Sequence, residues 1–377
     1  MGMNLPDSPL VDVGILARLF DDRTTSYKFF FFLALLDAIE RRRLDPFLTR
    51  DESYAIPMRE LGIDMAMAAW FPHGFCRLSF GAQDKLQSEV DRVDVGAIRG
   101  AWINRGGSEW RNLRKRFEDT VDPERYLRYV QYRLIQPFFS VELRGKPDGA
   151  KNGLTVELAS SCFAQRKPLY CFSADKTRII LHNEWLEYID RNCAILKGWL
   201  LYQLTEYLQA RNPSVPGIVE KLAPPLKRAS LTTQSEWWKS ALSMLPGGAS
   251  CIYSGTRLDP SIFSLDHFLP WSFVAHDRLW NLVPVSKSVN SSKMDRLPSM
   301  QYIEGLANIH HAALACMKGC WNEGRWIKAV EPFILDLRMD KDSLLDRDKL
   351  REALKTGIQP LMAIAEGQGF EKEWKYI

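Results

Sequence analysis

An acidic and an imidazole side chain stand next to each other in the stretch Phe263-Ser264-Leu265-Asp266-His267-Phe268-Leu269-Pro270, whose apolar residues predict a β-strand over 262–269. Neighbouring side chains on a regular strand point to opposite faces of the sheet. If Asp266 and His267 serve one site, the strand must twist or end beside them, and we expect it to end at Pro270. This stretch therefore predicts the strand that carries the two candidate site residues.

A second strand and a helix are predicted after this stretch. The apolar run 282–285 is typical of a strand, and residues 286–294 predict a helix capped by Ser286. Asn290 and Lys293 are three residues apart, so they share one face of that helix. The loop between the strands ends at Asn281, which we expect to bond backbone across the loop and so to hold His267 in orientation.

These residue types supply what the hydrolysis of a phosphodiester requires. An imidazole titrates near neutral pH and can take a proton from water. Oxygen atoms of Asp and Asn hold a hard divalent ion, which neutralises charge on the phosphate, and a lysine adds a point charge. The sequence therefore predicts a phosphodiesterase site with four members, Asp266, His267, Asn290 and Lys293.

The segment from Cys251 to Pro298 carries Leu265-Asp266-His267-Phe268-Leu269-Pro270-Trp271-Ser272-Phe273, then Asn281, then Asn290-Ser291-Ser292-Lys293. In this order and spacing it resembles the HNH family of ββα-metal endonucleases, and in particular the HNH domain of CRISPR effector nucleases. The resemblance implies a DNA endonuclease that uses Mg²⁺, with Mn²⁺ as a substitute, and that nicks one strand per site.

The same resemblance implies a role for each residue of the module. Asp266 and Asn290 become metal ligands, His267 the general base, Asn281 a structural asparagine and Lys293 a phosphate contact. Many relatives hold a structural zinc with paired Cys-x-x-Cys motifs. Here only the first thiol, Cys251, is present, so we expect no structural zinc. His276 is expected to be structural or to lie near the phosphate.

The flanks resemble standalone HNH proteins of prokaryotic anti-phage and restriction systems. Ser26-Tyr27-Lys28-Phe29 and Arg211-Asn212-Pro213-Ser214-Val215-Pro216 carry this resemblance, and the nuclease subunit of Zorya-type defence is one such protein. It implies double-stranded DNA as substrate, a role in defence and other defence proteins as partners. An alternative stays open, in which the chain is a nucleic-acid-binding or regulatory component whose module is silent until a partner engages it.

Basic and aromatic residues interleave between Arg105 and Arg133, and this segment is the best candidate for a DNA-contacting surface outside the module. A competing interpretation is a solvated helix whose charges pair with nearby Glu and Asp. The predicted DNA contacts are Arg111, Arg114, Lys115 and Arg116 in this segment, and Lys287 and Arg296 in the module.

The whole chain is expected to be α+β and predominantly helical, in four parts. These are a helical domain over 1–143, a hairpin with a long helix over 144–249, the HNH module over 250–298 and a helical region over 299–377. Helices are predicted over 26–43 and 183–211, a strand over 154–158 and a hairpin over 169–181.

Composition places the chain among ordinary globular proteins. It has 377 residues, 46% hydrophobic and 25% charged, with a net charge of +4 that permits DNA binding without requiring it. Seven widely spread cysteines favour reduced thiols over a disulfide framework. The most apolar run, 29–36, is much shorter than the ~20 residues of a membrane span. We therefore expect a cytoplasmic protein without membrane insertion.

Overall fold

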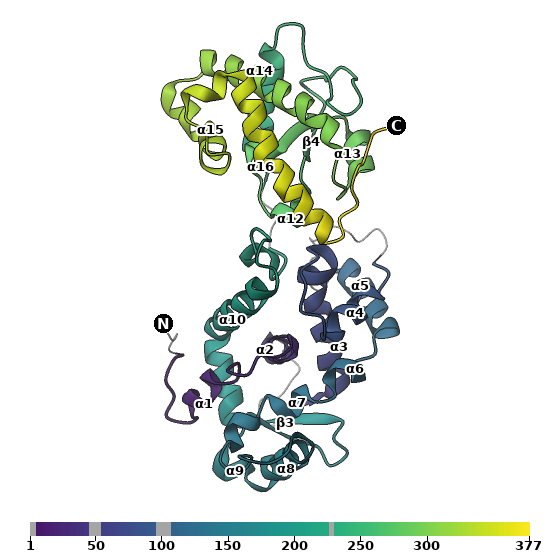
Figure 1. Ribbon diagram of the computed structural model, residues 1–377. Helices are drawn as coiled ribbons and strands as arrows, with labels where there is room; N and C mark the ends of the chain where they lie inside the picture. Colours follow the sequence, from purple (N-terminus) through teal and green to yellow (C-terminus); the bar gives the residue numbers. More distant parts are fainter. Residues whose placement is uncertain (1–4, 45–53, 96–106, 226–229) are drawn as a thin grey trace. The chain divides into compact units, whose positions relative to one another are not determined.

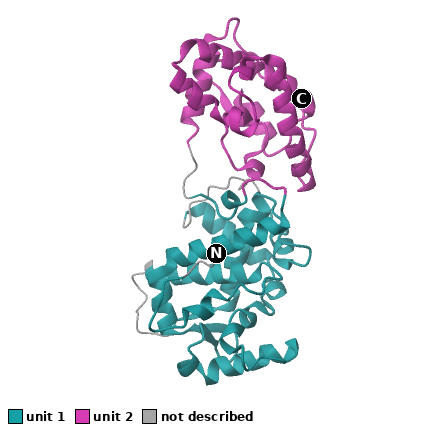
Figure 2. Ribbon diagram, turned by 60° about the vertical axis from the view of Figure 1, so that its left-hand side comes forward, with its two compact units in different colours: residues 1–213, 218–226 teal, residues 214–217, 227–377 magenta. Residues whose placement is uncertain are grey.

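The computed structural model describes residues 5–44, 54–95, 107–225 and 230–377 (Figure 1). The chain divides into two compact units, residues 1–213 with 218–226 and residues 214–217 with 227–377 (Figure 2). Both are mainly helical with small sheets, which confirms the predicted α+β, predominantly α class. No helix in the described parts of the chain has the length and apolar content to cross a bilayer.

An aromatic helix forms the centre of the first unit. In α2 (Tyr27–Leu44), the four phenylalanines 29–32 are each at most 1% exposed. This helix packs against α3 (Met58–Ala69) and α10 (Asn183–Arg211). Both predicted helices are confirmed, and the His182 side chain caps α10.

Shorter helices complete the first unit. They are α1 (Val13–Ala17), α4 (Lys85–Asp91), α5 (Ser108–Thr120), α6 (Glu124–Leu127), α7 (Val130–Arg133), α8 (Asp148–Ser161) and α9 (Phe163–Arg166), with a π-helical turn over Trp70–Phe75.

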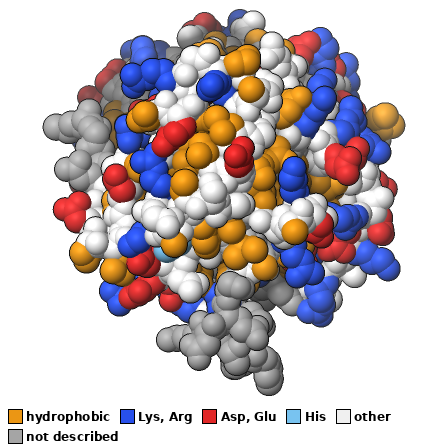
Figure 3. Space-filling view, turned by 90° about the horizontal axis from the view of Figure 1, so that it is seen from below, with side chains coloured by type: hydrophobic (Ala, Val, Ile, Leu, Met, Phe, Trp, Pro, Cys, Tyr) orange, Lys and Arg blue, Asp and Glu red, His pale blue; other side chains and the backbone are white. Residues whose placement is uncertain are grey.

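Figure 3 shows the face at the end where α8 and α9 lie. Apolar side chains gather near its centre, and basic and acidic side chains are interspersed around them, so the charge on this face is mixed.

The first unit contains a three-stranded antiparallel sheet. Its strand order is β1 (Ala55–Pro57), β3 (Arg178–Leu181), β2 (Tyr170–Phe172). The predicted hairpin is therefore confirmed. The predicted strand over 154–158 is wrong, because these residues belong to the helix α8. An alternation of only five residues also fits a helix, since Leu154 and Leu158 are four apart, and the helix formers around them decide the outcome.

The second unit is built around the predicted ββα module. Strands β4 (Ser264–His267) and β5 (Leu282–Val285) pair antiparallel, with Asp266 opposite Val283 and His267 opposite Leu282. Helix α13 (Lys287–Lys293) follows, and the Ser286 hydroxyl caps it by accepting from Val289 N. The strand–strand–helix prediction is thus confirmed, and β4 ends at His267 itself.

Helices from both sides of the module enclose it. They are α11 (Thr232–Met244) before it, the short α12 (Trp271–Val274) within it, and α14 (Ile303–Cys320), α15 (Glu323–Asp336) and α16 (Arg347–Gly367) after it. One hydrophobic core includes residues from the module and from these helices, among them Trp238, Phe268, Val283 and Phe333. The module is therefore part of a larger folded unit.

The C-terminal tail pairs with the segment that leaves α13. Trp374 N donates to Leu297 O at 3.0 Å, and Ser299 N donates to Trp374 O at 2.9 Å. The Trp374 ring packs against Tyr253 and Tyr302, with the Tyr253 centroid 5.1 Å away. Residues predicted as a separate C-terminal region thus share the core of the module.

A buried histidine in this core is expected to make the stability of the second unit depend on pH. His310 in α14 packs between Trp238 and Phe333, with ring centroids at 5.0 and 5.5 Å. Neither ring nitrogen has a hydrogen-bond partner among the described residues. Burial lowers the pKa of His310 to about 3. An unfolded histidine has a pKa of about 6.5, so the unfolded chain takes up this proton first as the pH falls.

We expect the contribution of His310 to stability to be complete above about pH 7 and to fall steadily below pH 6.5. At pH 4.5 the loss is about 2 to 3 kcal/mol, from two pH units at about 1.4 kcal/mol each. Urea unfolding at pH 7 and pH 4.5 measures this for wild type and His310→Phe. The variant should lose less stability on acidification by that amount, and equal losses in the two proteins would contradict the prediction.

Candidate active site

Asp266 lies buried at the end of β4 and is held by two donors. It is 2% exposed, and its Oδ2 accepts a hydrogen bond from Tyr253 Oη at 2.9 Å. Lys293 Nζ lies 3.2 Å from the carboxylate and donates to His267 O at 2.6 Å. The lysine therefore joins the end of α13 to the end of β4.

Lys293 was predicted to contact phosphate, and the structure places it inside the protein. Its side chain is 0% exposed, beside a carboxylate that is itself 3% exposed. Burial lowers the pKa of Lys293, while the neighbouring Asp266 carboxylate acts in the opposite direction. In this arrangement the ammonium neutralises Asp266 within the protein, and contact with phosphate stays a prediction.

Asn290 lies beside the residue that precedes Asp266. Its Nδ2 donates to Leu265 O at 3.2 Å, which assigns the amide nitrogen to the backbone and leaves Oδ1 as the atom able to bind a metal. A carboxylate offers about four acceptor positions, and Tyr253 and Lys293 occupy part of the set on Asp266. Two hard oxygen donors therefore lie on neighbouring elements.

These two donors fit a hard divalent ion. Mg²⁺ is bound through one or two protein oxygens together with water and substrate phosphate. In the described parts of the chain, no three His, Cys, Asp or Glu side chains gather closely enough to hold a metal. The candidate centre accordingly depends on the amide of Asn290 in addition to Asp266. Cys251 is a buried free thiol in the core of the unit.

His267 points to a partner that the sequence interpretation missed. Its Nε2 lies 2.8 Å from Asp277 Oδ1, and the two side chains are 10% and 18% exposed. Asp266 and His267 therefore meet different partners, as opposite faces of a strand require. The only sequence signal for Asp277 is an acidic residue in the loop ten positions after the histidine.

Asn281 makes the cross-loop bonds expected of it. It is completely buried, its Oδ1 accepts from Leu269 N at 2.8 Å and its Nδ2 donates to Leu269 O at 3.0 Å. Its backbone oxygen also accepts from Phe268 N at 2.8 Å. These bonds fix the two residues after His267, whereas the imidazole itself is bonded by Asp277.

The other histidine of the loop has a packing role. His276 stacks edge-on to Trp280, with ring centroids 5.4 Å apart, and its Nδ1 accepts from Arg278 N at 3.4 Å. Burial lowers the pKa of His276 to about 4, so the ring is neutral near pH 7. This agrees with the structural option that the sequence left open for it.

The predicted DNA contacts of the first unit lie on α5, and Arg114 and Arg116 are among those bonded within the protein. Arg114 pairs with the buried Asp64 and with Glu118, and Arg116 donates to Asp94 O at 2.6 Å. Arg111 and Lys115 are exposed. The start of the basic segment at Arg105 lies outside the described residues.

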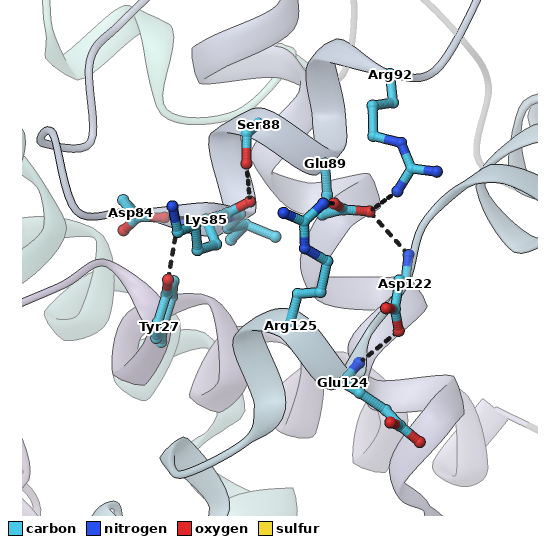
Figure 4. A network of polar contacts seen from close by, with 10 residues as sticks. Tyr27, Asp84, Lys85, Ser88, Glu89, Arg92, Asp122, Glu124 and Arg125 are labelled. Atoms are coloured by element: carbon cyan, nitrogen blue, oxygen red, sulfur yellow. Dashed lines mark hydrogen bonds and ion pairs between the residues drawn. The ribbon is translucent and has the colours of Figure 1, made fainter.

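Other charges of this basic segment belong to an internal network (Figure 4). The buried Glu89 of α4 pairs with Arg92 and with Arg125, and it accepts from Asp122 N at 2.9 Å. Paired charges are what the competing interpretation expects. DNA contact by this segment stays a prediction.

The two predicted contacts of the module differ in exposure. Lys287 is exposed at the start of α13. Arg296 is partly buried, donates to the carbonyls of Ser292 and Lys293 at the end of that helix, and lies over the Trp374 ring. Arg296 therefore caps α13 in this structure, and Lys287 keeps its side chain in solvent.

The residues that carry the weaker resemblance of the flanks have structural contacts. Ser26 N donates to Asp84 Oδ2 at 2.8 Å, and Asn212 bonds both backbone groups of Ser79. Tyr27 Oη accepts from Lys85 N at 2.7 Å (Figure 4). Lys28 Nζ donates to the carbonyls of Leu19 and Asp22.

Comparison with known proteins identifies the module. Residues 251–299 match the family model of the HNH endonuclease. No curated protein and no solved structure matches the chain. The matched stretch contains all the candidate site residues of the module, and this part of the chain is therefore similar to an HNH endonuclease domain. The second unit extends beyond it on both sides.

Proposed function

We propose that the protein is a metal-dependent DNA endonuclease that cuts one strand of double-stranded DNA per active site. The HNH endonuclease domain supports the nuclease activity. The observation that carries the chemistry is the end of β4, where an Asp–Asn pair of oxygen donors and a histidine bonded to a carboxylate occupy neighbouring positions. The matched domain has one such group of residues, and one active site cuts one strand per binding event, which supports nicking.

In the proposed mechanism His267 takes the proton of the attacking water and thereby forms the nucleophile. Asp266 and Asn290 would hold Mg²⁺, or Mn²⁺ in its place, and such an ion would supply positive charge that stabilises the phosphate in the transition state. Lys293 and Tyr253 keep the Asp266 carboxylate in one orientation. Asn281 fixes the backbone that follows the histidine.

A second candidate function is a partner-gated component of a defence system. The observation that favours it is the first unit, which has its own compact fold and contributes none of the candidate catalytic or metal-binding residues. Such a unit could recognise foreign DNA or other defence proteins and control the nuclease. The proposed role in defence rests on the sequence resemblance of the flanks.

Incubation of supercoiled plasmid with the purified full chain tests both candidates. With Mg²⁺ we expect nicked circles to accumulate before linear DNA, chelation by EDTA to stop the reaction, and added Mn²⁺ to restore it. Asp266→Asn should leave the plasmid supercoiled. Activity that needs proteins encoded beside this one would favour the gated component. A plasmid left intact by both ions, with and without those proteins, would rule out the nuclease.

A further inference from the structure

We infer that Asp277 is the positioning residue that fixes the orientation and tautomer of His267, and that helices outside the HNH stretch hold Asp277 in place. The inference rests on the proposed function of His267 as general base. The sequence pattern did not indicate Asp277 as a site residue. Its place in the site follows from the 2.8 Å contact between its Oδ1 and His267 Nε2.

The contact decides which imidazole nitrogen is the base. An ionised carboxylate only accepts hydrogen bonds, so Nε2 must carry the proton and donate it to Asp277 Oδ1. The lone pair is then on Nδ1, and this atom accepts the proton of water. Without Asp277 both tautomers become accessible, and in one of them Nδ1 carries a proton and cannot act as a base.

The carboxylate also helps after proton transfer. An imidazolium forms when His267 takes the proton, and a bonded carboxylate stabilises that charge while remaining ionised itself. Both side chains are largely shielded from solvent, which strengthens this interaction relative to an exposed pair. Asp277 thus acts through His267.

The loop that carries Asp277 is held from outside the matched domain. Gln234 Nε2 in α11 donates to Asp277 O at 3.2 Å. Asp336, the last residue of α15, accepts from Trp280 Nε1 at 2.7 Å and pairs with Arg278 Nε at 3.5 Å. One helix that precedes the HNH stretch in the sequence and one that follows it therefore bond the loop. Their bonds are to Asp277 and to the residues just after it.

These external bonds matter because the loop has little regular structure of its own. Between the end of α12 and the turn Leu279–Asn281 the backbone is irregular, and Ala275 is in the left-handed region at φ +56°. A displacement of about 1 Å of a positioning group can cost about 100-fold in rate. A loop of this kind needs the contacts of Gln234 and Asp336 to keep its carboxylate on the histidine.

Replacement of Asp277 by asparagine in the full chain tests the inference. We expect kcat for plasmid nicking to fall about 10²- to 10³-fold, with DNA affinity within about threefold of wild type. Asp277→Glu should recover part of the loss. Asp259→Asn is the matched control, since Asp259 is an exposed carboxylate of the same unit whose partner is Ser261.

A spectroscopic readout separates positioning from mere stability. The chain has six histidines, so ¹⁵N labelling of histidine can assign the His267 ring nitrogens. Wild type should show a protonated Nε2 and a free Nδ1 at pH 8, and Asp277→Asn should show a mixture of tautomers. Asp336→Asn and Gln234→Leu should shift the same signals less and lower kcat about tenfold.

The outcomes distinguish this inference from the proposed function. A wild-type kcat and an unchanged His267 tautomer in Asp277→Asn would overturn the role of Asp277, even if His267→Ala is inactive. If the wild type itself does not cleave DNA, the proposed function fails, and the tautomer measurement still decides whether Asp277 positions the ring. Should Asp277→Asn not fold, Asp336→Asn carries the same two measurements.

Discussion

Replacing His267 with alanine is expected to reduce the metal-dependent cleavage of DNA by about 10²- to 10⁴-fold, which is the range that general base catalysis contributes. The side chain is held by one bond to Asp277 at the edge of the core, so folding should change little. Single-turnover nicking of supercoiled plasmid at saturating protein measures the chemical step, and a filter-binding titration checks that DNA affinity is retained.

The control for this variant is a histidine of the same unit that is bonded to a backbone carbonyl. His311 in α14 has its Nε2 2.9 Å from Leu345 O, and His311→Ala should cleave at the wild-type rate. Added imidazole should restore part of the activity of His267→Ala, since the truncation leaves room beside Asp277. Cleavage by His267→Ala at the wild-type rate would remove this histidine from the mechanism and the proposed chemistry with it.

The order of the two strands and the helix in the module was predictable, because the residues that determine each element are close together in the sequence. Two apolar stretches and the Ser286 cap indicate two strands and a helix within about thirty residues, and the structure has β4, β5 and α13 there. The cross-loop bonds of Asn281 also follow from its position at the end of the loop. In each case the deciding residues are neighbours in sequence.

Contacts that depend on the path of a loop were not predictable in this way. Nothing in the spacing of Asp277 fixes its approach to His267, since Gln234 and Asp336 bring it there from distant helices. The same holds for Tyr253 on Asp266 and for the C-terminal tail beside Leu297. The strand predicted over 154–158 was wrong for a different reason, because five residues are too few to distinguish a period of two from one of 3.6.

Lys293 was expected to contact phosphate, and its burial leads to a different prediction. Lys293→Met removes the cation and keeps the volume, so the Asp266 carboxylate, at 2% exposure, keeps the Tyr253 hydrogen bond but loses its positively charged partner. Breaking a buried ion pair in this way costs about 3 to 5 kcal/mol. We expect urea unfolding of the second unit to show a loss of that size, and cleavage to disappear because Asp266 no longer keeps its orientation.

Two further variants distinguish a structural role of Lys293, in its buried ion pair with Asp266, from a phosphate contact. Lys293→Met combined with Asp266→Asn removes both charges, and it should recover part of the lost stability, since the cost lies in the unpaired carboxylate. Lys287→Met alters the exposed lysine at the start of the same helix and should leave stability within about 0.5 kcal/mol. If Lys293 instead reaches the phosphate, Lys293→Met would behave as Lys287→Met does in unfolding and would weaken DNA affinity. The free energy of unfolding therefore decides between the two roles before any cleavage is measured.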